Sequence, residues 1–228
     1  TKTEEKNNLL DCWPTAPLGN FTMNSNHEMY DGANGLFNIA LGSPLFAAQK
    51  STTYFQIAFG NWLIIALDSA YFDTSVMFMD GAITDAWQKN FLNQAGASGK
   101  KICILTHHNP LSTNGKKKLA LWNQVVNALG KNPDYWYWGH VHNGMVYTPQ
   151  SAGGGVNCRC LGNAAIPIGD AAWLKNNPAV SFYTNKPLVN TTPQQQLRVL
   201  NGFAMLQFSN NAVSEKWYYQ DGSQAWSS

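Results

Sequence analysis

All five histidines of the chain lie in three short polar segments, and each segment directly follows a strand-like run. Neutral imidazole is a common ligand of transition metals, and it exchanges a proton readily near neutral pH. Histidines placed at random would not all follow predicted strands, so the pattern favours metal or acid–base chemistry. The three segments are Asn26-His27, His107-His108 and His140-Val141-His142.

The third segment follows an aromatic run, residues 135–138, that is typical of a buried strand. Residues i and i+2 of an extended backbone project to the same side, so His140 and His142 are expected to reach one site. Open α/β folds bind ligands beyond the carboxyl ends of their strands. A single His-x-His pair fits two ordinary loop histidines about equally well, and only the repetition of the pattern favours a site.

Several other catalytic schemes are excluded by the sequence. It contains no Gly-x-Ser-x-Gly elbow, no P-loop and no Gly-x-Gly-x-x-Gly motif after the first predicted strand. No cysteine stands beside a histidine as a credible nucleophile. The glycine run at residues 153–155 is interpreted as a flexible turn rather than a phosphate cradle.

Composition sets the class of protein. The 228 residues are 44% hydrophobic and 12% charged, which is typical of a globular chain with one sizeable core. A formal net charge of +2 gives no nucleic-acid footprint, and no stretch approaches the roughly 20 apolar residues of a membrane span. The four cysteines, Cys12, Cys103, Cys158 and Cys160, are expected to be free thiols, which predicts a reducing, cytoplasmic location.

The elements that position the histidines are predicted from hydrophobic periodicity and turn residues. Strands are expected at residues 21–25, 52–59, 62–67, 102–106, 135–138 and 156–161. Helices are expected at residues 1–12 with Thr3 as the cap, from Thr84 or Asp85 to residue 95, at 117–129 and at 170–175. We expect one domain over residues 1–228, closed by a β-hairpin within residues 199–220. An apolar stripe of Trp87, Phe91 and Leu92 is expected in the core.

The three histidine segments together resemble motifs of the calcineurin-like metallophosphoesterases, a family that includes the purple acid phosphatases. Asn26-His27-Glu28 resembles the Gly-Asn-His-Asp/Glu motif of that family. Thr106-His107-His108-Asn109-Pro110 resembles its histidine motif, and Gly139-His140-Val141-His142 its terminal Gly-His-x-His motif. The resemblance covers residues 1–169 and implies an α/β fold of the αββα sandwich type with a binuclear metal centre.

The resemblance also implies roles for individual residues. Asn26, His107 and His140 would bind one metal ion, and His142 would bind the other, with Fe, Mn or Zn as suitable ions. His27 would face the phosphate as an acid or as a stabiliser of the transition state. His108, next to a ligand, is expected either to contact substrate or to support the ligands. Glu28 is expected to support the loop by hydrogen bonding.

Two features depart from the family pattern. Ser25 stands where the family has glycine, and the opening Asp-x-His and Gly-Asp motifs, which supply carboxylates to both ions, do not occur. We therefore expect the chain to bind at most one ion well. It would be a fragment, a chain completed by a partner, or a natural remnant without activity. An uncovered sheet edge is expected to pair with another copy or with the absent segment.

The sequence-based hypothesis is thus a metal-dependent phosphoesterase that hydrolyses phosphate mono- or diesters through a metal-activated water. The alternative is a non-catalytic binding module that keeps the fold, since nine Trp and nine Tyr could bind partners if they cluster on the surface. A third hypothesis is a mononuclear hydrolase that uses His107, His140 and His142. Substrate specificity is expected to lie in the loops at residues 31–49, 112–118 and 162–190.

Overall fold

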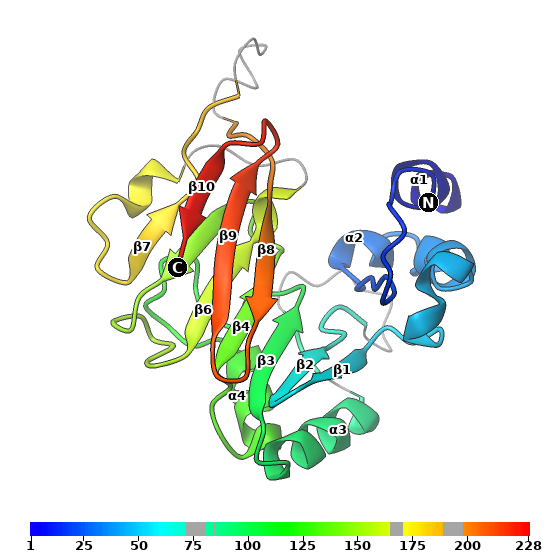
Figure 1. Ribbon diagram of the computed structural model, residues 1–228, viewed down its shortest axis with the longest axis horizontal. Helices are drawn as coiled ribbons and strands as arrows, with labels where there is room; N and C mark the ends of the chain where they lie inside the picture. Colours follow the sequence, from blue (N-terminus) through cyan, green and yellow to red (C-terminus); the bar gives the residue numbers. More distant parts are fainter. Residues whose placement is uncertain (72–80, 84, 165–170, 189–197) are drawn as a thin grey trace.

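The computed structural model describes residues 1–71, 81–83, 85–164, 171–188 and 198–228 (Figure 1). The candidate cap Thr84, the predicted helix start at residue 170, and residues 165–170 and 189–190 of the predicted specificity loop 162–190 lie outside these residues. The described chain is a mixed α/β structure, as predicted, with a seven-stranded and a three-stranded sheet.

The seven-stranded sheet has the order β1-β2-β3-β4-β6-β5-β7. Strands β2, β3, β4 and β6 are parallel, and β1, β5 and β7 each run antiparallel to their neighbours. The parallel strands are nearly continuous apolar runs because both of their faces are covered. The seven strands of this sheet are β1 Phe55–Phe59, β2 Trp62–Ala66, β3 Lys101–Thr106, β4 Tyr135–Trp138, β5 Gly144–Tyr147, β6 Asn157–Leu161 and β7 Val180–Tyr183. The hairpin at Gly60-Asn61 is confirmed, whereas β5 and β7 were not predicted.

Two helices, α3 (Ala86–Ala97) and α4 (Ala120–Leu129), pack on one face of this sheet through the largest hydrophobic cluster. Asp85 caps α3 by accepting a hydrogen bond from the Trp87 backbone N–H. The expectation that Trp87 lies in the core is wrong, because its side chain is 73% exposed. The neighbouring Gln88 is buried in its place, since its amide makes two hydrogen bonds to the backbone of Asp68, at 2.8 and 3.2 Å.

Strands β8 (Gly202–Phe208), β9 (Val213–Tyr219) and β10 (Gln224–Ser227) form the three-stranded sheet. The predicted closing hairpin is confirmed as β8 and β9, and β10 adds a third strand. This sheet packs on the face of the larger sheet that α3 and α4 leave open, around Trp62, Cys103 and Tyr137 (Figure 1). The described layers are therefore helices, seven-stranded sheet and three-stranded sheet, and the outer face of the last exposes Phe203 and Met205.

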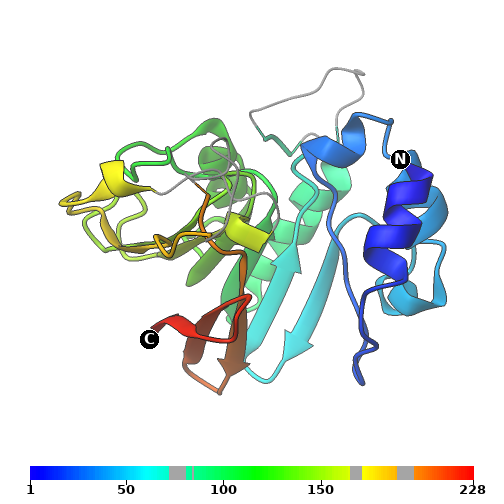
Figure 2. The ribbon, with the colours of Figure 1, turned by 90° about the horizontal axis from the view of Figure 1, so that it is seen from above.

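The N-terminal segment lies beside β1 and β2 and has a small hydrophobic cluster of its own (Figure 2). Its first helix, α1 (Lys2–Glu4), continues as a π-helix, η1 (Glu5–Leu10), and is capped by Thr1 rather than the predicted Thr3. Helix α2 (Asn26–Met29), a second π-helix η2 (Leu36–Ala40) and the 3-10 helix η3 (Pro44–Gln49) follow. Two further 3-10 helices occur later, η4 (Gly162–Ala164) and η5 (Ala172–Leu174).

The strand predicted at residues 21–25 does not form. The side-chain amide of Gln49 pairs instead with the Thr22 backbone, accepting from its N–H at 2.8 Å and donating to its C=O at 2.8 Å. One side chain thus satisfies backbone groups that a partner strand would otherwise have to satisfy. Within the described residues, no helix has the length and apolar character needed to cross a membrane.

Candidate metal centre

The histidine segments meet at the carboxyl edge of the seven-stranded sheet. His107 is the first residue after β3, and His140 is the second residue after β4. These two strands are parallel neighbours in the sheet. The Gly139 N–H donates to the His107 C=O at 3.1 Å, so the pairing continues one step beyond the strands. Asn26 is the first residue of α2, which Ser25 caps by accepting a hydrogen bond from the His27 N–H. Adjacent strand ends and one helix start therefore bring the three predicted ligands together.

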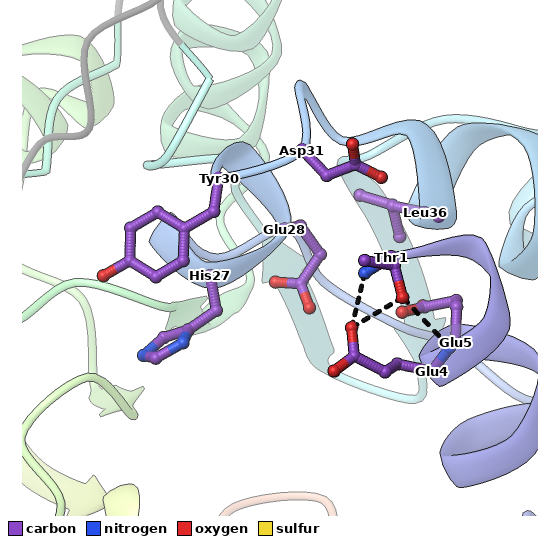
Figure 3. Close-up of a pocket in the computed structure, with 9 residues that line it drawn as sticks. Thr1, Glu4, Glu5, His27, Glu28, Tyr30, Asp31 and Leu36 are labelled. Atoms are coloured by element: carbon purple, nitrogen blue, oxygen red, sulfur yellow. Dashed lines mark hydrogen bonds and ion pairs between the residues drawn. The ribbon is translucent and has the colours of Figure 1, made fainter.

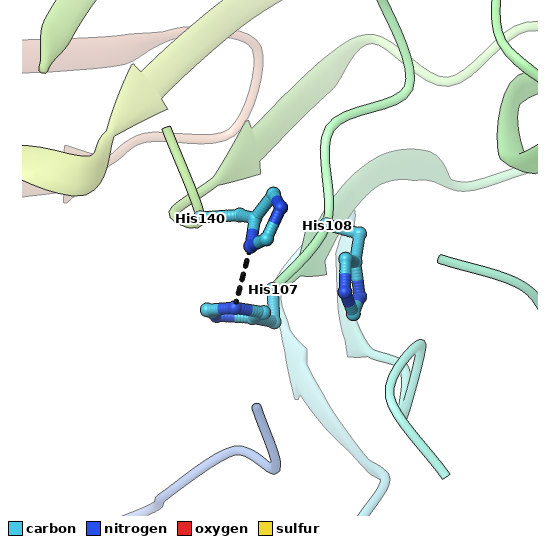
Figure 4. Close-up of side chains that lie close together, drawn as sticks. All are labelled: His107, His108 and His140. Atoms are coloured by element: carbon cyan, nitrogen blue, oxygen red, sulfur yellow. Dashed lines mark hydrogen bonds between the residues drawn. The ribbon is translucent and has the colours of Figure 1, made fainter. Parts of the chain in front are cut away.

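The polar atoms of these three residues form a close triangle. Asn26 Oδ1 lies 2.8 Å from His107 Nε2 and 3.2 Å from His140 Nδ1. The two ring nitrogens are 3.2 Å apart, a contact that Figure 4 marks with a dashed line, and the two ring planes are inclined by 73°. Asn26 is only 4% exposed. Ligands held at about 2.1 Å from one ion are themselves spaced by about 3 Å in octahedral and about 3.4 Å in tetrahedral coordination, which is close to the size of this triangle.

Hydrogen bonds between neutral side chains satisfy at most two of the three sides of this triangle. Asn26 Oδ1 only accepts, and each neutral ring nitrogen is either a donor or an acceptor. If one ring nitrogen carries a hydrogen, the lone pair of the other faces the lone pairs of Asn26 Oδ1. If both carry one, both can donate to Asn26 Oδ1, and the two ring nitrogens then make no hydrogen bond to each other. A cation bound by all three atoms would be attracted to a lone pair of each.

The protonation state of His107 suits a metal ligand. Burial, followed by the neighbouring His108 and His140, lowers the pKa of His107 from 6.5 to about 2. The ring is therefore neutral at physiological pH. A metal ion binding there would not have to displace a proton from a charged imidazolium.

His140 and His142 reach the site by a different route from the one predicted. His140 has a φ of 52°, and the loop does not continue in extended form. The Val141 N–H donates to the Gly139 C=O and the Asn143 N–H to the Val141 C=O, both at 2.6 Å. These contacts close two successive three-residue turns. The expectation of an extended His-x-His backbone is wrong, although both side chains line the same cavity.

His142 lies outside the triangle. Its ring centroid is 6.1 Å from that of His27, and its Nδ1 is buried without a hydrogen-bond partner. Buried polar atoms are normally paired, so an orphaned ring nitrogen beside a cavity is itself a sign of a ligand site. Within the described residues, the group of histidines whose ligand atoms lie within 4.8 Å of one another is His107, His108 and His140.

His108 is held by a residue that the sequence analysis did not single out. Ser69 Oγ accepts a hydrogen bond from the His108 N–H at 3.1 Å and lies 3.1 Å from His108 Nδ1. Ser69 lies shortly after β2, so its position directly after an apolar run was the available signal. His108 is 1% exposed and is not among the residues that line the cavity, which favours support of the ligands over substrate contact.

The cavity beside the triangle has a volume of about 520 Å³. Four histidines, His27, His107, His140 and His142, are among its polar lining residues. Met23, Leu161 and Ala164 are among its apolar lining residues. Ligand cavities commonly have this size and this combination of an apolar wall with a few polar groups.

His27 also borders a second cavity of about 450 Å³ (Figure 3). Its ring lies 5.0 Å from that of Tyr30, and the carboxylates of Glu4, Glu5 and Glu28 also line this cavity. Ser25 Oγ donates a hydrogen bond to Glu28, which agrees with the predicted role of Glu28 in supporting the loop. His27 itself is exposed and so has access to both spaces.

No protein-family model and no curated protein matches the chain. Solved structures are similar at low identity. GAP50, described as the anchor in the inner membrane complex of Plasmodium, is 14% identical with a TM-score of 0.49 over 77% of this chain and 52% of that chain. Purple acid phosphatase PPD1 from yellow lupin (Lupinus luteus) seeds is 16% identical with a TM-score of 0.49 over 94% and 38%. PhoD is 12% identical with a TM-score of 0.38 over 78% and 44%.

The chain thus spans about half the length, or less, of each of these three proteins. Such identities and TM-scores do not assign a family or an activity. The functional argument therefore rests on the geometry of the chain's own residues.

Proposed function

We propose that this chain is a metal-dependent phosphoesterase of the calcineurin-like type, which hydrolyses phosphate mono- or diesters. The observation that supports it best is the triangle of Asn26 Oδ1, His107 Nε2 and His140 Nδ1, with sides of 2.8 to 3.2 Å. Three segments far apart in the sequence converge there, each with the residue type that the resemblance requires.

The donor set fits one metal ion. An amide oxygen and two neutral imidazoles suit Fe, Mn or Zn. When bound, such an ion supplies Lewis-acid polarisation of a phosphoryl oxygen and lowers the pKa of water. A binuclear centre needs further ligands, and His142, with its unpartnered Nδ1, is the described residue in position to contribute one.

The chain's own side chains supply orientation and a proton. Asn26 Nδ2 lies 3.5 Å from the Tyr30 hydroxyl, which turns Oδ1 toward the two histidines. His27 lines the same cavity and is not part of the triangle. In this proposal it binds the phosphate and donates a proton from its imidazole ring to the leaving oxygen.

The apolar wall of the cavity indicates a suitable probe. Met23, Leu161 and Ala164 would contact an uncharged aryl or alkyl group attached to the phosphate. Para-nitrophenyl phosphate and its bis-ester present such a group and report hydrolysis by colour. They also separate monoesterase from diesterase activity.

The test compares His140→Ala and His27→Ala with Val141→Ala, which changes the residue between the two loop histidines. His140→Ala is expected to lose metal affinity and hydrolysis together, because it removes one of three ligands. His27→Ala is expected to keep the metal and lose turnover by about 10²- to 10⁴-fold, the usual contribution of a general acid. Val141→Ala is expected to keep both. Metal content and ester hydrolysis are measured on all three variants after the same dialysis.

Each failure has a distinct meaning. Unchanged turnover in His140→Ala would refute the ligand assignment, and loss of metal in His27→Ala would show that His27 is a ligand instead. Metal binding without hydrolysis of either ester would favour the non-catalytic binding module.

A further inference from the structure

The loop that carries His140 and His142 crosses the end of a strand. It joins β4 to β5, and these two strands lie on either side of β6. Cys160 of β6 is paired with Trp138 on one side and with Met145 on the other. Residues 139–143 therefore form an arch over the carboxyl end of β6, with Cys160 beneath it.

Three carbonyl oxygens of the arch point down onto the Cys160 sulfur. Cys160 Sγ lies 3.4 Å from the Gly139 oxygen, 3.4 Å from the Val141 oxygen and 3.2 Å from the Asn143 oxygen. Burial raises the pKa of Cys160 to about 12, so the thiol keeps its hydrogen and remains a donor. One thiol thus contacts every second residue of the arch, and the two residues between them are His140 and His142.

Gly162 also contacts the arch from below, beside Cys160. Its N–H donates to the Asn143 C=O at 3.1 Å. A Cβ at this position would overlap the Val141 carbonyl and lie 3.2 Å from the Gly139 oxygen. Only glycine lets the arch approach the chain this closely.

The arch needs such support because its backbone is strained. His140 adopts a φ of 52° that disfavours a side chain with a Cβ, and such residues persist where their surroundings hold them in place. We propose that Cys160 and Gly162 are positioning residues that hold the carbonyls of the arch and thereby aim His140 and His142 at the metal site. The metal-binding measurement that tests this inference rests on the proposed function. The hydrogen-exchange measurement rests only on the contacts described above.

The test uses Cys160→Ala, Cys160→Ser and the matched control Cys158→Ala. Cys158 lies on the same strand and the same face, is equally buried, and its pKa is likewise raised to about 12 by burial, but it does not lie under the arch. Two quantities are measured: Zn²⁺ affinity by competition with a chromogenic chelator, and amide hydrogen exchange of Val141 and Asn143 in metal-free protein.

Cys160→Ala is expected to weaken Zn²⁺ binding by about 10- to 100-fold, as is usual when a supporting contact of a ligand is removed. It should also speed exchange at Val141 and Asn143. Cys158→Ala should change neither, and Cys160→Ser, which keeps a shorter donor, should fall between the two. If Cys160→Ala does not fold, the serine variant carries the same comparison.

Equal Zn²⁺ affinity and equal exchange in Cys160→Ala and Cys158→Ala would overturn the inference. A wild-type chain that binds no Zn²⁺ would refute the proposed function alone. In that case the exchange rates of Val141 and Asn143 would still decide the role of Cys160.

Discussion

A polar group between the two sheets and another at the edge of the larger sheet can be compared side by side. Between the sheets, Arg159 of β6 meets Glu215 of β9. At the carboxyl edge, the polar atoms of Asn26, His107 and His140 lie 2.8 to 3.2 Å apart. Arg159 and Glu215 are buried, whereas at the edge Asn26 is buried and the two histidines are half-buried, and the hydrogen bonding of the two groups also differs.

The group between the sheets is complete. Arg159 Nη2 donates to Glu215 Oε1 at 2.9 Å, and Nε donates to both carboxylate oxygens at 3.1 Å. The Tyr137 hydroxyl donates to Glu215 Oε2 at 2.9 Å, and Arg159 Nη1 donates to the Cys158 C=O at 3.0 Å. A buried ion pair is tolerated when further hydrogen bonds satisfy it in this way. Such a group has no need of a ligand, and removing one of its members is expected to change the stability of the fold.

In the group at the sheet edge, hydrogen bonds satisfy at most two of the three contacts. No assignment of hydrogens to neutral rings satisfies all three of its contacts. The neighbouring His142 Nδ1 is orphaned as well. The comparison teaches that unsatisfied polarity, rather than burial, distinguishes a ligand site from a structural one. The following predictions test that distinction, from the largest expected effect to the smallest.

Glu215→Ala should strongly destabilise the protein without weakening metal binding. It leaves the Arg159 guanidinium buried and unpaired, which costs about 3–5 kcal/mol of unfolding free energy. Chemical denaturation measures the loss, and metal titration of the folded variant checks the site. The double variant Arg159→Met/Glu215→Leu should lose much less, since it removes both charges. An equally unstable double variant would show that packing, rather than the unpaired charge, causes the loss.

Tyr137→Phe should lower the unfolding free energy by about 1.5–3 kcal/mol at pH 7, the usual contribution of a hydrogen bond to a charged group. Burial, and next the Glu215 carboxylate, raise the pKa of Tyr137 well above its usual value. The unfolded chain loses this proton from about pH 10, whereas the folded one keeps it. Stability is therefore full below pH 10 and falls above it.

Above pH 10, the Tyr137 hydroxyl alone lowers the unfolding free energy by about 1.4 kcal/mol per pH unit. Denaturation curves from pH 9 upward should therefore be less steep in pH for Tyr137→Phe than for the wild type. Parallel pH dependence in the two proteins would mean that the hydroxyl is not protected between the sheets.

His140→Gly should be more stable than His140→Ala by about 1 kcal/mol in the presence of a chelator. Both variants lack the ligand, but only glycine accepts the left-handed φ of this position without strain. Unfolding free energies from denaturant titration measure the difference. Equal stability would mean that residues 139–143 relax once the histidine is gone. Cys160 and Gly162 would then not hold this segment in its conformation.

Much of the fold was predictable because local signals determine it. The apolar runs before His107 and His140 define β3 and β4, and Gly60-Asn61 marks the first hairpin. Misses occurred where one side chain replaced a regular partner. The strand expected at residues 21–25 is absent because Gln49 binds the Thr22 backbone. Trp87 is exposed because Gln88 turns toward Asp68.

The site was predictable in its members but not in its geometry. Asn26, His107 and His140 follow directly from the motifs, and they do converge. The turn that presents His140 depends on Cys160, 20 residues later, and no local pattern reports such a contact. The contact between Ser69 and His108 could not be predicted for the same reason, because it joins residues 39 positions apart.

The central claim is that the triangle of Asn26, His107 and His140 holds one metal ion. Metal content per chain, measured by elemental analysis after dialysis against a weak chelator, tests it most directly. The account predicts close to one equivalent for the wild type and almost none for His140→Ala. Equal metal content in the two proteins, or none in the wild type, would contradict it.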